Sequence, residues 1–271
     1  MNNETRQQLK NLLNTRDFFQ KLRIKASNYI EIRKDGSKNN SFGKAKIDED
    51  TIPIIVDFIN DCKEQEDRLA KQIDEVVIND QMWNGFFRGI KGIGSMGAAY
   101  ILAYIDIEKG STRARIYQYC GLNPSMVRAK KINSKTYEIK ETDFMIRGDK
   151  LTSGYMCPYN SYLRSRLYGI VASGIIKAGC RTNKETGEII YSKYYKIYSD
   201  RKNRMKNSRK PVYEGSDRLW CDETAAHLDM DARRYMIKEL LSDFYETYRA
   251  QEGLEVRPRY SEEYLGRVHH V

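Results

Sequence analysis

The chain is poor in the residues that build metal and disulfide sites. It has five Cys, which form no Cys-x-x-Cys pair, and three His, all within the last 45 residues. An odd number of scattered cysteines is typical of reduced thiols in the cytoplasm and does not suggest a disulfide framework or a zinc ribbon. His227 lies near Asp229 and Asp231, but no second His or Cys stands at ligand spacing. We therefore expect neither a metal site nor a cofactor.

Long apolar runs are missing as well. No stretch approaches the ~20 apolar residues that span a bilayer, and the polar start Met-Asn-Asn-Glu-Thr-Arg does not resemble a signal peptide. No spaced set of carboxylates suggests a two-metal nuclease. These absences predict a soluble cytoplasmic protein without a membrane partner.

Positive charge is what the chain has in excess, and it is concentrated in the middle. Of the 47 Lys and Arg and 37 Asp and Glu, residues 128–210 hold 20 basic and 7 acidic side chains. Residues 1–127 hold 19 and 17, and residues 211–271 hold 8 and 13. A central segment of net charge +13 favours a polyanionic partner.

Two long helices are predicted before residue 80. Residues 4–33 lack Pro and Gly, and their apolar residues recur at three- and four-residue steps: Leu12, Phe19, Leu22, Ala26 and Tyr29. After a loop at 35–41, a second helix is expected from Thr51 as its N-cap. Its seam, interrupted by Glu66, consists of Ile52, Ile55, Ile59, Cys62, Leu69, Ile73 and Val76. Residues 1–80 are thus predicted to form an antiparallel hairpin arm, which packs within the chain or, as a coiled coil, against a second copy.

The stretch from Phe86 to Pro124 contains a glycine turn between apolar segments. Its centre, Ile90-Lys91-Gly92-Ile93-Gly94-Ser95-Met96-Gly97, precedes an apolar run from Ala98. This order predicts a helix-hairpin-helix over residues 84–105, in which glycines permit a tight turn and the second helix presents free N–H groups. The main chain from Gly92 to Gly97, with Lys91, is then a predicted phosphate site. In the alternative, the hairpin serves only to pack the fold.

The rest of the chain is predicted to be helical around one irregular basic insert. Thr112 caps a helix that ends at Gly121, further helices are expected at 159–178 and 191–209, and a last one from about Asp222 to Gly253. Alternation at 136–140 and 143–146 allows a small β-hairpin, and 181–190 is predicted as a loop. We expect a mainly α-helical fold with an arm (1–80), a helix-hairpin-helix core with a basic insert (81–210) and a C-terminal helical region (211–271).

Basic side chains after the hairpin are the further candidates for binding nucleic acid. They are Arg128, Lys130, Lys131, Arg147, Lys150, Arg164 and Arg166. Phosphate contacts carry no base identity, so binding is predicted to be sequence-tolerant and strongly salt-dependent. A stripe of tyrosines at helical spacing is either core, which we favour, or a base-stacking platform: Tyr191, Tyr194, Tyr195 and Tyr198. Ser125 and Ser153 lie in basic surroundings and are the candidate nucleophiles.

With these motifs in view, the chain resembles a known domain. It is similar to the C-terminal domain of bacterial insertion-sequence transposases that combine a RuvC-like DEDD nuclease domain with a helix-hairpin-helix domain, also called bridge-RNA-guided recombinases. The likeness covers roughly residues 52–205 and depends on Gly89–Ala103, Tyr119-Cys120-Gly121-Leu122-Asn123-Pro124, Asn160, Leu163, Arg164 and the aromatic segment Tyr194–Tyr198.

The chain departs from that family in two respects. In that family a RuvC-like domain precedes the arm. Here the residues before the hairpin, 1–80, predict only the two helices of the arm itself. The family's catalytic serine follows the Gly-Leu-x-Pro turn in a Ser-Gly context, whereas Ser125 has only the position and Ser153-Gly154 only the neighbours. The resemblance therefore implies binding of DNA, with structured RNA as a second candidate, in a phage or mobile-element setting. We expect a homodimer formed through the arm, or a separate catalytic protein as partner.

Three functions stay open from the sequence. The preferred one is a sequence-tolerant DNA-binding protein that is not a complete transposase by itself. The second is a minimal serine-dependent recombinase or strand-transfer enzyme. The third is a structural or inhibitory protein whose arm binds another chain.

Overall fold

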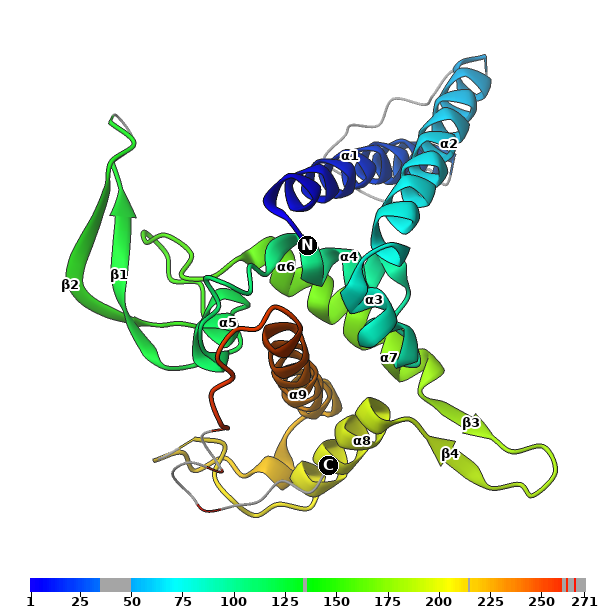
Figure 1. Cartoon of the computed structure of the whole chain (residues 1–271). Coiled ribbons are helices and arrows are strands. Elements are labelled where there is room, and N and C mark those ends of the chain that lie inside the picture. The colour runs from blue at the N-terminus through cyan, green and yellow to red at the C-terminus, as the bar shows by residue number, and fades with distance from the viewer. Residues whose placement is uncertain (35–49, 134–135, 214, 260–261, 263–265, 267–271) are drawn as a thin grey trace. The chain divides into compact units, whose positions relative to one another are not determined.

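The computed structural model describes residues 1–34, 50–133, 136–213, 215–259, 262 and 266. The described chain is mainly helical, with two small antiparallel sheets, and forms two compact units, Met1–Trp83 and Asn84–Val271 (Figure 1). Residues 211–271, expected to be a separate region, belong to the second unit because the last helix supplies its core. The loop predicted at 35–41 lies outside the described residues.

The first unit is an antiparallel pair of long helices, α1 (Asn3–Lys34) and α2 (Thr51–Ile78). The predicted seam of α2 is confirmed in its C-terminal half, where Cys62, Leu69 and Ile73 are buried. Val77 takes the buried position expected for Val76. The seam of this half is thus covered within the chain. Helix α2 starts with Thr51, so its N-cap is the preceding residue.

Helix α1 packs through a different stripe from the predicted one. Leu9, Leu13 and Ile30 are buried, whereas Leu12 is half-buried and Tyr29 is 38% exposed. The two stripes are one residue apart around the helix. Because both carry apolar side chains, periodicity alone did not distinguish them.

A buried carboxylate of α2, Glu66, forms ion pairs with α1 at the point where the predicted seam is interrupted. The Glu66 side chain is 6% exposed, and its Oε1 lies 2.5 Å from Nε of Arg23. A second guanidinium, of Arg16, lies 4.0 Å away. The hydrogen bond to Glu66 raises the pKa of Arg23. The arginines of α1 therefore compensate the charge that α2 buries.

We expect Arg23→Met to lower the free energy of unfolding of the arm by about 1–3 kcal/mol, because it leaves Glu66 buried without its closest partner. The loss should fall below that of a fully enclosed pair, since the Arg23 side chain is 30% exposed. The double variant Arg23→Met/Glu66→Leu should recover most of it. Urea denaturation followed by circular dichroism measures both, and a double variant as unstable as the single one would contradict the explanation.

Helix α9 (Ala225–Gln251) forms the centre of the second unit. The Thr224 hydroxyl caps it by accepting a hydrogen bond from the backbone N–H of His227 at 3.2 Å. Helices α5 (Arg113–Tyr119) and α8 (Lys193–Lys206) pack against it. Large side chains of α9 are fully buried there: Met236, Leu240, Leu241, Phe244, Tyr245 and Tyr248.

The helix predicted at 159–178 is present from Ser161 to Ala178 and has an unusual middle. It consists of α6 (Ser161–Arg166), the π-helical turn η2 (Leu167–Ala172) and α7 (Ser173–Ala178). Asn160 caps it by accepting from the N–H of Leu163 at 2.9 Å. Helix α4 (Ser95–Tyr104), buried over most of its length, packs against α6 and η2.

Two β-hairpins extend from the helices of this unit (Figure 1). Strands β1 (Met126–Ile132) and β2 (Ile139–Arg147) are antiparallel, with Lys131 opposite Lys140. The sequence predicted a hairpin here but chose the wrong strands, because the partner of 139–147 is 126–132. Strands β3 (Cys180–Thr182) and β4 (Ile189–Tyr191) replace the predicted loop. Strands of three residues are too short to show alternation.

Candidate nucleic-acid interface

The glycine turn joins the short helix α3 (Gln81–Gly85) and the 3-10 turn η1 (Phe87–Gly89) to α4. Gly92 has a φ of +91°, in the left-handed region. A Cβ there would lie 2.3 Å from the carbonyl oxygen of Gly174 and 2.6 Å from Cα of Ile175. A Cβ on Gly174 would likewise lie 2.2 Å from the carbonyl oxygen of Gly92. Gly92 therefore serves the packing of the turn against α7.

The start of α4 is the open part of the turn. Its N-cap, Gly94, is exposed, and a Cβ there would meet no atom within 4 Å. No side chain caps this end of α4. Ser95 and Met96 are half-buried, whereas Ile93 and Gly97 are buried. The N–H groups of the first helical turn, which have no intrahelical partner, are thus available to an anion.

Two of the predicted basic candidates form ion pairs at the ribbon β1–β2. Nζ of Lys130 lies 2.9 Å from Glu141, and a guanidinium nitrogen of Arg147 lies 2.9 Å from Asp149. Burial opposes the charge of Asp149, but Arg147, with Arg234 and Arg164 nearby, holds the pKa of this carboxyl below its usual value. Both cations are thus partly neutralised within the fold.

Two further candidates lie against aromatic rings. The guanidinium of Arg164 is 4.9 Å from the ring centroid of Tyr159, and it donates to the carbonyl oxygen of Asp149. The guanidinium of Arg166 is 5.0 Å from the ring centroid of Tyr162. Both arginines are half-buried, so their guanidinium groups are partly engaged within the fold.

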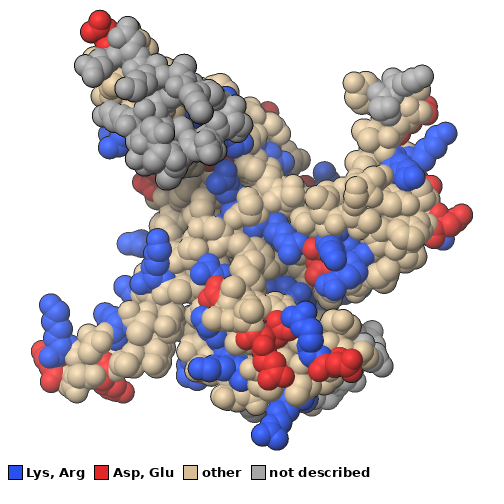
Figure 2. All heavy atoms as spheres, turned by 180° about the vertical axis from the view of Figure 1, so that it is seen from behind, with Lys and Arg blue, Asp and Glu red and all other residues tan. Residues whose placement is uncertain are grey.

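The other predicted cations are exposed, and within the described residues they have no ion-pair partner: Lys91, Arg128, Lys131 and Lys150. Other basic residues of the second unit share these properties but were not chosen as site residues, among them Lys140, Arg204, Lys206, Arg209 and Lys210. Figure 2 shows Lys and Arg spread over the projecting hairpins and the helical body, with Asp and Glu between them, rather than gathered into one patch. A polyanion would therefore meet several separate cationic points.

Two of the four tyrosines in the predicted stripe belong to the core, whereas Tyr191, at the end of β4, is 46% exposed and its ring stacks on that of Tyr195. Tyr194 and Tyr198 are 5% and 6% exposed, respectively. Their hydroxyls donate to Asp243, at 2.7 Å, and to Asp229. Burial raises the pKa of both phenols. Tyr194 and Tyr198 therefore anchor α8 to α9.

Asp229 collects two further donors that sequence reasoning missed. Nζ of Lys202 lies 3.2 Å from its carboxylate and Nε of Arg233 lies 2.5 Å away. Burial opposes its charge, but hydrogen bonds from Tyr198, Arg233 and Lys202 hold the pKa of Asp229 below its usual value. Arg233 also donates to Oγ of Ser173, next to the π turn, at 2.9 Å. Asp229 and Arg233 are one helical turn apart in α9, but Tyr198 and Lys202 lie in α8, so no local pattern reveals the whole network.

Neither candidate serine has the neighbours of an activated nucleophile. Ser125 is exposed, and its hydroxyl donates to the amide oxygen of Asn123 at 2.9 Å. Ser153 is exposed in the loop before α6. In the part of the chain that the structure describes, neither hydroxyl bonds to a His, Asp, Glu or Lys that would act as a base. The geometry gives no support to a serine-dependent reaction.

The described residues contain no group of three His, Cys, Asp or Glu arranged to hold a metal ion. His227 instead pairs with Glu223 at 2.5 Å, and its ring centroid lies 5.4 Å from that of Trp220. His269 and His270 lie outside the described residues. The contacts of His227 are thus with Glu223 and Trp220, which precede it in the chain.

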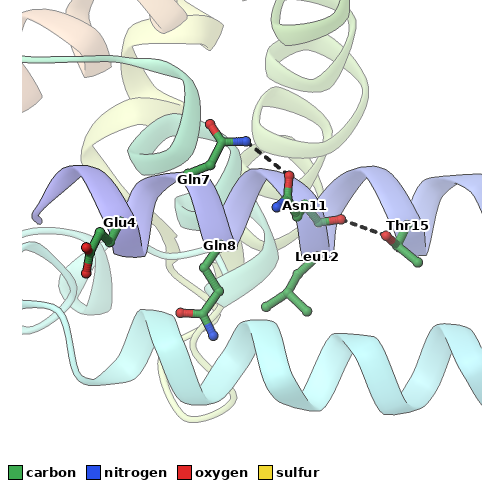
Figure 3. Close-up of a pocket in the computed structure, with 6 residues that line it drawn as sticks. All are labelled: Glu4, Gln7, Gln8, Asn11, Leu12 and Thr15. Carbon is green, nitrogen blue, oxygen red and sulfur yellow. Dashed lines mark hydrogen bonds between the residues drawn. The ribbon is translucent and has the colours of Figure 1, made fainter.

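A hollow of about 500 Å³ lies along the N-terminal part of α1 in the first unit (Figure 3). Gln7 donates to the side-chain oxygen of Asn11 at 3.0 Å, and Thr15 donates to the carbonyl oxygen of Asn11 at 2.8 Å. Gln8 and Leu12 point from α1 toward the neighbouring helix. The polar side chains that line the hollow thus partly hydrogen-bond with one another. Among the described residues that line it, Glu4 is the charged one.

A second hollow, of about 480 Å³, lies along α8 and α9 and has a mixed-charge lining. Arg259 holds three carboxylates there, of Asp243 at 2.7 Å, Glu246 at 2.9 Å and Glu239 at 3.1 Å. These ion pairs hold the segment after α9 against the helix. Carboxylates outnumber cations in this lining, which makes the hollow unsuitable for a phosphate.

Of the helices described, none combines the length and the apolar character that a membrane span requires. Comparison of the chain with protein-family models, with curated proteins and with solved structures finds no match.

Proposed function

We propose that the chain is a sequence-tolerant DNA-binding protein that holds the sugar–phosphate backbone at the start of α4. The observation that carries the proposal is the exposed N-cap Gly94, which provides no side-chain cap for the N–H groups of the first turn. Lys91, three residues earlier, adds an exposed cation without an ion-pair partner in the described chain. Helix N-termini with a nearby cation are suited to phosphate groups.

Separate cations elsewhere in the second unit support the same function. Arg128, Lys131 and Lys150 are exposed and unpaired among the described residues. Main-chain N–H groups and lysines contact phosphates without reading bases, so they give affinity without sequence preference. We therefore expect the logarithm of the binding constant for duplex DNA to fall linearly with the logarithm of salt, by about 0.9 per phosphate contacted.

Gly94→Asp tests the proposal. Its carboxylate would cap the free N–H groups and repel a phosphate, so we expect affinity for duplex DNA to fall about tenfold or more. The fold should survive, because Asp is a favoured N-cap and the position is open. Fluorescence anisotropy of labelled duplex across a salt series measures the effect.

Gly169→Asp is the matched control. Gly169 is exposed in η2, and a Cβ there meets no atom within 4 Å, so the variant makes the same change of charge at another open position. Affinity should change less than twofold to threefold, because this charge lies outside the first turn of α4 and is screened at ordinary salt. A flat salt response, or equal losses for Gly94→Asp and Gly169→Asp, would overturn the proposal.

The proposal agrees with what the resemblance to the transposase C-terminal domain implies, namely binding rather than complete transposition. In that setting we propose that catalysis belongs to a separate protein, and that the arm provides for self-association. Leu12, Phe19 and Leu22 of α1 stay half-buried within one chain and are the residues through which a second copy would pack.

A further inference from the structure

One face of the ribbon β1–β2 carries a stacked aromatic pair. The rings of Phe144 and Tyr155 have centroids 5.3 Å apart and planes inclined by 15°. Tyr155 is held beside β1, because the N–H of Met156 donates to the carbonyl oxygen of Lys130 at 2.8 Å. Phe144 nevertheless stays 54% exposed. The ring face of Phe144 that is turned away from Tyr155 is therefore open to a ligand.

Two unpaired lysines accompany this aromatic pair. The ammonium of Lys131 lies 4.9 Å from the ring centroid of Tyr155, and Lys140 stands directly opposite Lys131 in the ribbon. Both are exposed and lack an ion-pair partner among the described residues. Like charges directly opposite each other destabilise a hairpin. An anion bound between them would remove this repulsion.

The adjacent cross-strand pair differs in charge. Lys130 and Glu141 stand opposite each other and form an ion pair at 2.9 Å. At this end of the ribbon, Lys131 and Lys140 therefore keep their positive charge, and the ammonium of Lys131 lies over the ring of Tyr155.

Open aromatic faces beside unpaired cations are the combination by which proteins hold unpaired nucleotides, with a base on the ring and phosphates on the cations. A base inside a duplex has both faces covered by its neighbours, so it has no face to stack on a protein ring. An acidic peptide would satisfy the lysines but would leave the ring of Phe144 without a flat partner. The pattern therefore favours single-stranded nucleic acid over a duplex or a protein.

We propose that the ribbon β1–β2 binds single-stranded nucleic acid, with a base stacked on Phe144 and adjacent phosphates on Lys131 and Lys140. This inference rests on the proposed function and adds unpaired nucleotides to its substrate class. Duplex backbone at the start of α4 and a single strand on the ribbon would make a junction between double- and single-stranded nucleic acid the preferred ligand.

The test compares a labelled oligothymidine of about 16 nucleotides, the upper site size of a single-strand-binding module, with a duplex of the same length. Phe144→Leu in the full chain should weaken binding of the single strand about tenfold and leave duplex affinity unchanged. Phe144→Trp should retain the affinity and show tryptophan quenching when the oligothymidine binds. Met145→Ala, a change at the neighbouring exposed apolar residue, should affect neither ligand.

The outcomes separate this inference from the proposed function. If Phe144→Leu binds the oligothymidine as tightly as the wild type does, the inference is overturned, while salt-dependent duplex binding lost in Gly94→Asp still supports the proposed function. Competition by polyglutamate as effective as by unlabelled oligothymidine would identify a general anion surface and also overturn the inference. Failure of the wild-type chain to bind either nucleic acid would overturn both.

Discussion

Gly92→Ala is expected to lower the free energy of unfolding of the second unit by more than about 3 kcal/mol, the sum of a forced left-handed residue and an overpacked contact. The new Cβ would lie 2.3 Å from the carbonyl oxygen of Gly174, which belongs to the backbone of a helix and cannot rotate away. The φ of +91° adds strain wherever the methyl group points. Thermal or urea unfolding of the full chain measures the loss.

Gly174→Ala should cost a comparable amount, because its Cβ would lie 2.2 Å from the carbonyl oxygen of Gly92. Gly89→Ala is the control from the same turn: the position is exposed, and a Cβ there meets nothing within 4 Å. Its unfolding free energy should change by less than about 1 kcal/mol. Similar stabilities for Gly92→Ala and Gly89→Ala would show that the two glycines are not in tight contact.

Variants of Gly92 and Gly94 therefore test different properties, the stability of the fold and the binding of DNA. A loss of DNA affinity in a Gly92 variant would report a damaged fold, since Gly92 contacts α7. A loss in Gly94→Asp would report the binding site, since Gly94 is open and its backbone is extended rather than left-handed. Only the second result bears on the proposed function.

Asp229→Asn is expected to lower the free energy of unfolding at neutral pH by about 2 kcal/mol, because a carboxylate that accepts from three donors is replaced by a neutral amide. The donors are Tyr198, Lys202 and Arg233, which join α8 and α9. Asp200→Asn is the matched control: the Asp200 side chain is 64% exposed and pairs with Lys196 at 3.0 Å. It should cost less than about 0.5 kcal/mol.

The cost of Asp229→Asn should depend on pH in one direction. Hydrogen bonds from Tyr198, Arg233 and Lys202 hold the pKa of Asp229 below its usual value, despite burial. Its unfolded-state pKa is about 3.9, so the stability it contributes is fully present above about pH 4 and is lost as the pH falls through the folded-state pKa. Urea denaturation at neutral and acidic pH should show the difference between Asp229→Asn and the wild type shrinking in acid. A difference that grew in acid would contradict this account.

Helices were the part of the fold that local patterns predicted best. Segments predicted at 4–33, 159–178 and 191–209 are helical over most of their length, because apolar spacing and capping residues act within a few residues of one another. The strand partner of 139–147 was wrong, and the hairpin at 180–191 was missed. Pairing depends on residues that the local window does not contain, and both ribbons are largely exposed.

In the candidate site, too, local composition predicted one property and missed another that depends on distant segments. Composition located the excess of positive charge after residue 128, yet it could not tell Lys130 and Arg147, which are paired, from Lys131 and Lys150, which are not. The partner of Arg147 is two residues away, but the partner of Lys130 lies on the opposite strand. Ion pairing is a property of the folded surface, so charge counts overestimate what a polyanion can use.

The sequence by itself determined that this protein is mainly helical, that its middle third is strongly basic, and that the turn around Gly92 and Gly94 has a special backbone, because these properties depend on composition and local spacing. Only the tertiary structure decided that Gly92 packs against Gly174, that Gly94 opens to solvent, and that Lys131 lies over the ring of Tyr155 beside Phe144. Each of these arrangements depends on segments that are brought together only by folding. Whether a residue stays open or a charge stays unpaired is decided by the distant segment that packs beside it.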